Sequence, residues 1–469
     1  MLEITLVLNT QSGEPLYLQL YQYFKQEIQN GRIEAGVMLP SKRKLALYLG
    51  ISQNTIETAY QQLLAEGYVE SKPRKGSFVK EIHHDWILNS IKVPTTRDEM
   101  EKEENGPNLI DFSHGKIALE QFPYTTWRRL TIQSMYEEQS TLFLNGDGQG
   151  ELPLRKEIAK YLFQSRGVRC TPGQIIVGAG TQYLIGLLSM IIGRDAIFSM
   201  EDPGYHRTRE VFKDQGVTII PIPLDDNGIS MKHLYKSNAQ VTYVTPSHQF
   251  PFGMVMPITR RLELLKWAEG KERYIIEDDY DGEFRYKGKP IPSLQGLDPN
   301  DKVIYLGTFS KSLIPSIRLN YMVLPPTLLK KYQEHFSLYK QTVSRLHQHT
   351  LWQFMKEGHW ERHLNKIRTV YRKRQNTLIS SIKENMGNQV AIIGEEAGLH
   401  ILLHVKNNMS EKQLIETAMK HKVKVYPTSV YFSQPTPEQK PIILLGFGGL
   451  TESAIEQGIQ YLKKAWNLS

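Results

Sequence analysis

Short apolar runs alternate with longer amphipathic stretches over residues 152–308, and this alternation leaves few folds open. The short runs are typical of strands, whereas stretches such as 152–167 repeat apolar residues at helical spacing. Strands that alternate with helices predict a mostly parallel sheet with crossover helices. The candidate strands are IIVGAG (175–180), AIFSM (196–200), VTIIPI (217–222), VTYVTP (241–246), YIIEDD (274–279) and VIYLGT (303–308).

Beyond Pro325 and Pro326 the pattern changes. A long helical region extends to about residue 386 and leads into AGLHILLHV, KVKVYP and PIILLGFG, which predict a smaller mixed sheet. With 469 residues the chain is too long for one simple core, so two or three domains are expected. The fold class predicted for residues 109–469 is therefore α/β, with a large parallel-sheet subdomain and a small α+β subdomain.

Residues 81–108 interrupt these patterns. They lack sustained apolar periodicity and end in a charged run followed by Asn-Gly-Pro, which is typical of a tether between domains. A surface helix with a loop is the alternative, because the run DEMEKEE is able to wind. The predicted division is an N-terminal domain at 1–80, a linker at 81–108 and a larger domain at 109–469.

The first eighty residues have the pattern of a winged helix-turn-helix. One helix carries an apolar stripe formed by Tyr17, Leu20, Tyr21, Phe24 and Ile28. Ser41 is the expected N-cap of a second helix that Gly50 closes, and Ser52 is the expected N-cap of a third. The basic turn at 72–76 between two short apolar runs predicts a hairpin, or wing. The inward face of the third helix is expected to consist of Ile56, Ala59, Tyr60, Leu63 and Leu64.

This pattern predicts binding to double-stranded DNA. The third helix can enter the major groove with the short polar side chains of its first turn, and the basic residues can meet phosphates. A solvated basic face on a protein-interaction domain is the alternative. The predicted DNA-binding residues are Ser41, Lys42, Arg43, Ser52, Gln53, Asn54, Thr55, Arg74, Lys75 and Gly76.

Charge and cysteine content narrow the class of protein further. The formal net charge of +8 permits a polyanionic partner without requiring one. Cys170 is the only cysteine, which excludes a disulfide framework and a thiolate metal cluster, and no metal site is predicted. The longest strongly apolar stretch, 183–193, is about half a membrane span and is typical of a core helix. Without a basic n-region or cleavage site, the N-terminus predicts a cytoplasmic protein.

Lys311 lies between two serines in GTFSKSLIPSIRL (307–319), seven residues before Arg318. A lone lysine is most often a surface residue, but other groups accompany this one. Asp278 and Asp279 end an apolar strand, where ligands bind in open α/β sheets, and GAGTQ (178–182) offers a turn whose amides can hold a phosphate. Pyridoxal 5′-phosphate (PLP) requires such a set: a lysine amine for a Schiff base, an acid for the pyridine nitrogen, and an arginine and amides for the phosphate.

Two family resemblances rest on longer motifs. The segment LPSKRKLALYLGISQNTIETAYQQLLAEGYVESKPRKGSFV resembles the DNA-binding domain of the GntR superfamily, with Gln53 where that family often has arginine. Residues 109–469 resemble a fold-type-I aminotransferase domain, and the combined chain resembles the GabR-like MocR subfamily of GntR regulators. The motifs of the second resemblance, in family order, are FPYTTWRRL, GQGELPLRKEIAKYLFQSRGV, GAGTQ, EDPGYHR, TPSHQFPFG, IIEDDYDGEF and GTFSKSLIPSIRL.

The resemblance implies roles for individual residues. Lys311 is the Schiff-base lysine, Asp278 is the partner of the pyridine nitrogen, and Tyr280 contacts the ring hydroxyl. Tyr205 borders the cofactor and the effector, and Arg207 is the residue implied for the effector's acid group. The residues implied around the phosphate are Thr181, Gln182, Thr308, Ser310 and Arg318.

The chain departs from the aminotransferase pattern where the cofactor hydroxyl is bound. Phe250 stands at the place of the asparagine that commonly hydrogen-bonds this hydroxyl, which leaves His248 or Gln249 to compensate.

A second departure concerns the effector's acid group. Leu444 stands where many aminotransferases have the arginine that binds the substrate α-carboxylate, and Val430 stands where GabR-like regulators have another late arginine. Arg207 is then the one evident carboxylate clamp, so γ-aminobutyrate is a less expected effector than in the most similar regulators.

The function expected first is that of a PLP-dependent DNA-binding transcriptional regulator. A small amine or amino-acid effector would displace Lys311 by aldimine exchange and so reposition the winged helices on a DNA operator. The resemblance also implies a head-to-tail homodimer and no membrane. The alternatives are an active PLP-dependent aminotransferase and a regulator of vitamin B6 synthesis that senses PLP itself. The sequence leaves open the effector, the operator and the direction of regulation.

Overall fold

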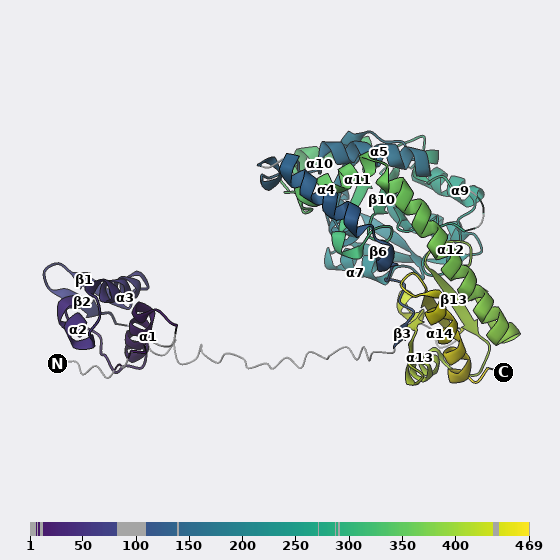
Figure 1. Cartoon of the computed structure of the whole chain (residues 1–469). Coiled ribbons are helices and arrows are strands. Elements are labelled where there is room, and N and C mark those ends of the chain that lie inside the picture. Colours follow the sequence, from purple (N-terminus) through teal and green to yellow (C-terminus); the bar gives the residue numbers. More distant parts are fainter. Residues whose placement is uncertain are drawn as a thin grey trace. The chain divides into compact units, whose positions relative to one another are not determined.

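The computed structural model of this chain describes residues 6, 8–9, 13–81, 109–137, 140–270, 272–286, 288, 291–434 and 440–468. It divides into two compact units, Met1–Glu104 and Asn105–Ser469 (Figure 1). Apart from residue 81, the predicted linker at 81–108 lies outside the described residues, so the linker stays a prediction. No helix in the described part of the chain is long and apolar enough to cross a membrane.

The N-terminal unit contains three helices and a hairpin. They are α1 (Leu16–Gln29), α2 (Lys42–Leu49), α3 (Gln53–Ala65), β1 (Val69–Lys72) and β2 (Gly76–Val79). Both predicted N-caps are confirmed, because Ser41 Oγ accepts a hydrogen bond from the amide of Lys44 and Ser52 Oγ accepts one from the amide of Thr55. β1 and β2 pair antiparallel and form the predicted wing.

The core of this unit lies between α1 and α3. Leu20 and Phe24 of α1 are fully buried together with Ile56 and the other predicted α3 residues up to Leu63. The prediction for Leu64 is wrong, since this side chain is 44% exposed. It lies roughly a quarter turn around the helix from the centre of the buried face.

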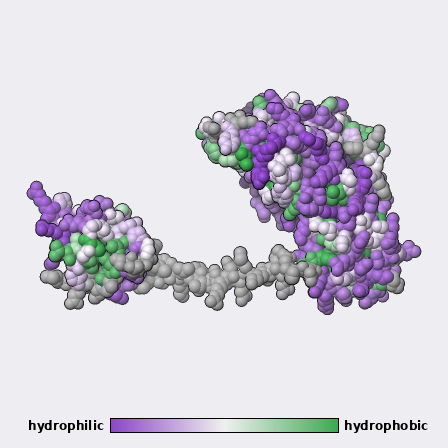
Figure 2. Space-filling model, in the orientation of Figure 1, coloured by the Kyte–Doolittle hydropathy of each residue, from purple (hydrophilic) through white to green (hydrophobic). Residues whose placement is uncertain are grey.

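Apolar side chains also lie on the surface of the N-terminal unit. Met38 is 53% exposed and Leu47 is 83% exposed. On the face of this unit that is visible in Figure 2, hydrophobic residues gather in one region. These two side chains therefore contribute little to the unit's core.

An eight-stranded sheet forms the centre of the larger unit, in the order β4-β11-β10-β9-β8-β5-β6-β7. The six predicted strands are confirmed to within three residues at either end, and β10, β9, β8, β5 and β6 pair in parallel. β11 was not predicted; it runs antiparallel between β4 and β10. The strands are β4 (Ile175–Ala179), β5 (Ile197–Asp202), β6 (Thr218–Asp225), β7 (Gly228–Ile229), β8 (Val241–Val244), β9 (Tyr274–Asp279), β10 (Val303–Thr308) and β11 (Leu319–Val323).

Helices cover both faces of this sheet. Alternate residues of each strand point to opposite faces, so Ile175 and Val177 pack into one buried cluster and Ile176 packs into another. The predicted core helix at 183–193 is confirmed as α6, and the predicted helical region ends at Met386. The helices are α4 (Tyr124–Glu137), α5 (Leu152–Arg166), α6 (Thr181–Ile192), α7 (His206–Asp214), α8 (Met231–Lys236), α9 (Ile258–Ala268), α10 (Pro326–His335), α11 (Arg345–Lys356) and α12 (His359–Met386).

A smaller sheet follows α12, which extends towards it from the large sheet (Figure 1). Its strands β12 (Val390–Ile393), β13 (His400–Val405), β16 (Ile442–Gly446) and β15 (Tyr426–Pro427) pair antiparallel in that order. The prediction of a mixed sheet is therefore wrong. The segment KVKVYP contributes to two different sheets. Its first part, β14 (Val423–Lys424), pairs in parallel with β3 (Ile110–Asp111) in a separate ladder, and its last two residues form β15. The helices α13 (Glu411–Lys420) and α14 (Glu452–Ala465) complete this part.

Candidate functional site

The predicted site residues meet at one edge of the large sheet. Gly307 of β10 lies opposite Asp279 of β9, so these parallel strands end together. Leu319 at the start of β11 lies opposite Ala179 near the end of β4. Because β11 is antiparallel to both of its neighbours, Arg318 lies at the edge where the other strands finish. Ligands of open α/β sheets bind at this edge.

The turn between β4 and α6 is built for close approach. Gly180 has a φ of +94°, which favours glycine, and as the N-cap residue of α6 it has no side chain to cap the first amides of the helix. A Cβ at position 180 would lie 2.3 Å from Nη2 of Arg318. Thr181 Oγ1 hydrogen-bonds the side-chain amide of Asn320. Helix amides and a guanidinium therefore lie side by side, an arrangement suited to a phosphate group.

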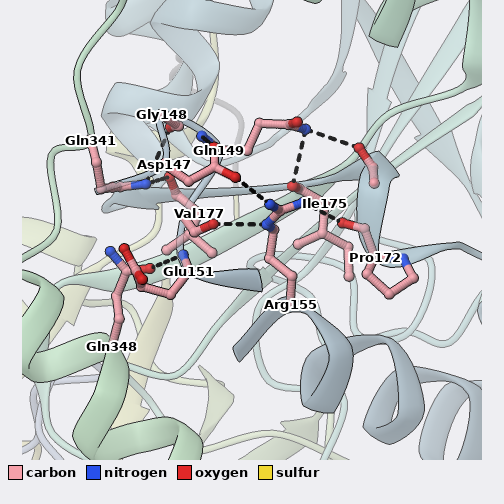
Figure 3. A network of polar contacts seen from close by, with 12 residues as sticks. Asp147, Gly148, Gln149, Glu151, Arg155, Pro172, Ile175, Val177, Gln341 and Gln348 are labelled. Carbon is pink, nitrogen blue, oxygen red and sulfur yellow. Dashed lines mark hydrogen bonds and ion pairs between the residues drawn. The ribbon is translucent and has the colours of Figure 1, made fainter. Parts of the chain in front are cut away.

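A polar network fastens the loop at 146–151 to β4, the strand that leads into this turn (Figure 3). Arg155 of α5 is buried; it forms an ion pair with Asp147 and donates from Nε to the carbonyl of Gly150 at 2.8 Å. The carbonyl of Gln149 accepts a hydrogen bond from the amide of Val177 at 2.8 Å. The glycine-rich loop at 146–151 is thereby fastened to β4 at Val177, the residue before GAGTQ (178–182).

The remaining predicted phosphate residues lie around the same edge. Thr308 Oγ1 accepts a hydrogen bond from the amide of Ser310 at 3.0 Å, which shapes the loop after β10. Thr181 is partly buried, and Gln182 and Arg318 are exposed. The structure thus brings all five residues to the ends of β4, β10 and β11.

Lys311 follows β10 by three residues and is partly buried. Its Nζ donates a hydrogen bond to the carbonyl of His114 at 2.7 Å. Burial lowers the pKa of Lys311, Asp281 opposes this shift, and Arg207 adds to it. A lysine with a lowered pKa is more often deprotonated, and its amine is then a usable nucleophile. The contact with His114 was not predicted from sequence.

The two acids at the end of β9 have different surroundings. Asp279 accepts hydrogen bonds from Arg166 Nε and from Tyr305 Oη, both at 2.6 Å, so its charge is paired inside the protein. Asp278 accepts a hydrogen bond from Tyr243 Oη, and the described residues place no ion-pair partner on it. Burial raises the pKa of Asp278 to about 7. Asp278 is therefore the acid left to meet a cationic group.

Tyr243 could have been found in the sequence. It lies in VTYV, a run of four buried residues, and a buried tyrosine hydroxyl usually needs a hydrogen-bond partner. Its partner Asp278 comes from the adjacent strand β9.

Tyr280 is held by a histidine and an acid. Its Oη lies 2.9 Å from His248 Nδ1 and 3.0 Å from the carbonyl of His248. The same Nδ1 lies 3.0 Å from Oδ2 of Asp281. Sequence reasoning named His248 only as one of two alternatives and missed Asp281.

Aromatic rings line the region beside Lys311. The ring of Phe250 lies 4.7 Å from that of Tyr431, 5.2 Å from that of Tyr205 and 5.4 Å from that of His114, measured between centroids. Leu444 is fully buried in the same cluster. The two departures at Phe250 and Leu444 therefore pack together and give this side of the site an apolar wall.

Arg207 lies at the second position of α7 and is exposed. Burial raises the pKa of Tyr205, and a hydrogen bond with Arg207 opposes that rise, so the two side chains are neighbours. Arg207 also lowers the pKa of Lys311. Arg207 thus acts on the region around Lys311, whereas Val430 is 47% exposed and offers no charge.

The predicted DNA-binding residues lie on the second and third helices and the wing. Gln53 and Asn54 are exposed at the start of α3, but Thr55 is partly buried and its hydroxyl bonds that of Ser52 at 2.8 Å. Lys42 forms an ion pair with Glu57 at 2.6 Å. The other predicted residues are Ser41 and Arg43 at the start of α2 and Arg74, Lys75 and Gly76 in the wing turn.

Comparisons with known proteins match both units. Residues 16–79 match the family model "Bacterial regulatory proteins, gntR family", and residues 107–440 match "Aminotransferase class I and II". An uncharacterised HTH-type transcriptional regulator of Bacillus subtilis, YdeL, is 47% identical over the full length of both chains. The probable rhizopine catabolism regulatory protein MocR of Rhizobium meliloti is 33% identical and covers 98% of this chain and 96% of its own.

A solved structure agrees with the fold of the larger unit. The kynurenine aminotransferase of Pyrococcus horikoshii superimposes with a TM-score of 0.68 at 26% identity, covering 77% of this chain and 91% of its own. A winged helix-turn-helix and an aminotransferase-type domain in one chain define a class of bacterial regulatory proteins. This chain belongs to the GntR family, in the MocR-type branch that carries both domains.

Proposed function

We propose that this chain is a PLP-dependent, DNA-binding transcriptional regulator whose larger domain senses an amine or amino-acid effector at Lys311. One observation carries the proposal: Lys311, the buried acid Asp278 and the turn beside Arg318 share one sheet edge in a chain that also has a winged helix-turn-helix. The proposed domains are those predicted from sequence, 1–80, 81–108 and 109–469.

The residues present fit PLP. Asp278 would face the pyridine nitrogen, because it is a buried acid with a raised pKa and without an ion-pair partner among the described residues. Arg318 and the amides at the start of α6 would hold the phosphate, and Tyr280 would face the ring hydroxyl. When bound, the cofactor supplies an electrophilic aldehyde carbon to which a primary amine can add. Gln182, Thr308, Ser310 and Tyr205 complete the proposed cofactor contacts.

Side chains around Lys311 explain how the site would bind an effector amine. Burial lowers the pKa of Lys311, which increases the fraction of neutral lysine amine. The neutral amine is the form that can react with the cofactor aldehyde and that an effector amine can later displace. The ring of Phe250 and its aromatic neighbours exclude water from one side. Arg207 is the proposed partner for an acid group of the effector, by charge-assisted hydrogen bonds. With Leu444 and Val430 at the alternative positions, we propose an effector with at most one acid group.

The same residues argue against a dedicated aminotransferase. A transaminase must orient the substrate carboxylate as well as its amine during proton transfer. The arginine that does this in many aminotransferases is replaced by the buried Leu444. We therefore propose effector sensing, with DNA contacts through the ten residues of α2, α3 and the wing named above. A head-to-tail homodimer would place two winged helices on two half-sites.

The proposal is tested by linkage between effector and DNA. Amines are first screened by the visible absorbance of the PLP-loaded protein, and the responding amine is then added to a fluorescence-anisotropy titration of DNA from upstream of the chain's own gene. We expect DNA affinity to change by about 5- to 150-fold, with a reciprocal change in amine affinity on adding DNA.

Three results of that measurement would contradict the proposal. Unchanged DNA affinity with every amine that shifts the spectrum would separate the cofactor from regulation. Sustained release of a keto acid would favour an aminotransferase. A change of DNA affinity on adding PLP alone to cofactor-free protein, with no effect of any amine, would favour a sensor of PLP itself.

Replacing Gly180 by alanine is expected to weaken PLP binding by roughly 10- to 100-fold. The new Cβ would lie 2.3 Å from Nη2 of Arg318 and push the guanidinium out of the phosphate position. The measurement is a PLP titration of cofactor-free protein followed by absorbance.

The matched control is Gly193→Ala, at the other end of the same helix. Gly193 also has a positive φ, +116°, but a Cβ there meets nothing within 4 Å. Both variants therefore carry backbone strain, and only Gly180→Ala displaces Arg318. Equal PLP affinity in the two variants would show that the position of Arg318 does not matter for binding.

A further inference from the structure

His248 is a buried histidine that connects three parts of the larger unit. It lies in the loop after β8 and is 1% exposed. Its Nδ1 faces both Asp281 and the hydroxyl of Tyr280, at 3.0 Å and 2.9 Å. Its ring also lies 5.0 Å from the ring of His400, the first residue of β13 in the small sheet.

Two glycines leave room for the ring of His248, because a side chain at either position would meet it. A Cβ at Gly398 would lie 2.0 Å from Cε1 of His248, and a Cβ at Gly253 would lie 3.1 Å from its Nε2. Nε2 is buried and has no hydrogen-bond partner among the described residues. Because the acceptor Asp281 faces Nδ1, the ring proton belongs on Nδ1. His248 therefore presents one N–H, and it presents it to Asp281 and Tyr280.

Gln249 was the other residue that could compensate for the missing asparagine. Its side chain is already engaged in hydrogen bonds around its own loop. Its Nε2 donates to the carbonyls of Pro203 at 3.0 Å and Phe250 at 2.6 Å, and its Oε1 accepts from the amide of Phe252. Its side chain shapes the turn, whereas that of His248 reaches Tyr280.

A metal site is the competing interpretation. One ligand atom each from His248, Asp281 and His400 lies within 4.8 Å of the others, and all three residues are buried. However, Nε2 of His400 lies 3.0 Å from the carbonyl of Pro251, and Nδ1 of His248 is already directed at Asp281. The contacts favour a hydrogen-bonded cluster over a set of open ligands.

We propose that His248, oriented by Asp281, is a positioning residue that fixes the hydroxyl of Tyr280 and thereby sets the proton affinity of the Lys311 nitrogen in the PLP-loaded protein. This inference rests on the proposed function. The Nδ1–H of His248 donates to the oxygen of Tyr280, and the phenol proton goes to the carbonyl of the same His248, so His248 holds the Tyr280 hydroxyl from two sides. With the cofactor bound, the phenol proton would turn from this carbonyl to the cofactor's ring hydroxyl, while Nδ1–H keeps the oxygen in place. A donor at that hydroxyl withdraws negative charge from the neighbourhood of the Lys311 nitrogen, so the nitrogen binds its proton less tightly.

Other groups act on the same nitrogen and stay constant in the test. Arg207 lowers the pKa of Lys311 and Asp281 raises it. The titratable groups packed about His248 are Asp281, Tyr280 and His400, and His114 lies beside His400 and Lys311.

The test uses two amides in place of the histidine. In His248→Asn the side-chain N–H takes the place of Nδ1, whereas in His248→Gln it moves outward towards the position of Nε2. The pH midpoint of the visible absorbance of the PLP-loaded protein is measured for both and for Tyr280→Phe. We expect His248→Gln and Tyr280→Phe to raise the midpoint by about one pH unit, a tenfold change in proton affinity, and His248→Asn to stay near the unmodified protein.

A double variant separates positioning from general damage. If His248 acts through Tyr280, adding His248→Gln to Tyr280→Phe should shift the midpoint no further. Additive shifts, or a His248→Gln midpoint equal to that of the unmodified protein, would overturn the positioning role. A shift on adding a chelator would overturn it in favour of a bound metal. An unmodified protein with no PLP-dependent visible band would instead contradict the proposed function.

Discussion

Replacing Lys311 by alanine is expected to abolish covalent attachment of PLP and the effector response together. The ε-amine is the group that the aldehyde carbon requires, and alanine leaves none at the end of β10. Borohydride reduction followed by intact-mass measurement should show one added cofactor on the unmodified chain and none on Lys311→Ala. The variant should still bind DNA, but its affinity should no longer change with amines.

The matched control for this prediction is Lys330→Ala. Lys330 lies on α10 with a side chain that is 77% exposed, so its loss removes a lysine without touching the site. Lys330→Ala should retain both the trapped cofactor and the amine response. If borohydride still trapped PLP on Lys311→Ala, the cofactor would be attached to another lysine. The proposal would then be wrong about its central residue.

Replacing Asp278 by asparagine is expected to have opposite effects on PLP binding and on the stability of the cofactor-free protein. Removing one partner of a buried ion pair costs about 3 kcal/mol, so PLP affinity should fall roughly a hundredfold. Without PLP, the same change removes a buried acid that has no ion-pair partner among the described residues. Asparagine can still accept the hydrogen bond from Tyr243, so little local packing is lost.

The effect on stability should depend on pH. The pKa of Asp278 is raised to about 7 by burial, so the folded state binds its proton more tightly than the unfolded state. Stability without PLP therefore falls as pH rises from about 4 to about 7 and then levels off. Asp278→Asn removes this pH-dependent loss of stability. Above pH 7 the variant should therefore be more stable than the unmodified protein, by about a few kcal/mol at most, because the pKa shift of Asp278 limits the gain.

Asp279→Asn is the matched control, one residue further along β9. Asp279 pairs with the buried Arg166, so its neutralisation should lower stability by about 3–5 kcal/mol, with or without PLP. Urea denaturation at pH 5 and pH 8 measures both variants. A cofactor-free Asp278→Asn protein that is less stable at pH 8 than the unmodified chain would show that Asp278 is already paired.

Local patterns in the sequence were enough to predict most helices and strands and the location of the candidate site. Ser41, Ser52 and Gly50 cap helices through contacts within three or four residues, so they can be recognised without the fold. The strands of the large sheet are buried on both faces and therefore appear as continuous apolar runs. Lys311 follows one such run and Asp278 and Asp279 end another, and together with the GAGTQ turn they predicted the sheet edge.

Other features depended on neighbours that are remote in the sequence. β11 was missed because its five residues follow a loop without an α-helix and pair with β4, which lies far earlier in the chain. Leu64 was misplaced because it stands at the border of a helical stripe, where packing decides exposure.

By itself, the sequence determined the two kinds of domain and six strands of the large sheet, because apolar periodicity and helix caps are local properties. Its motifs also joined Lys311, Asp278 and Arg318 in one expected site. Only the tertiary structure decided which acid of the Asp278–Asp279 pair is left without a countercharge, since successive residues of a strand point to opposite faces and Arg166 arrives from α5 on one of them. In the same way it assigned His248 to Tyr280, because the ring fits there only where Gly398, from a distant segment, carries no side chain.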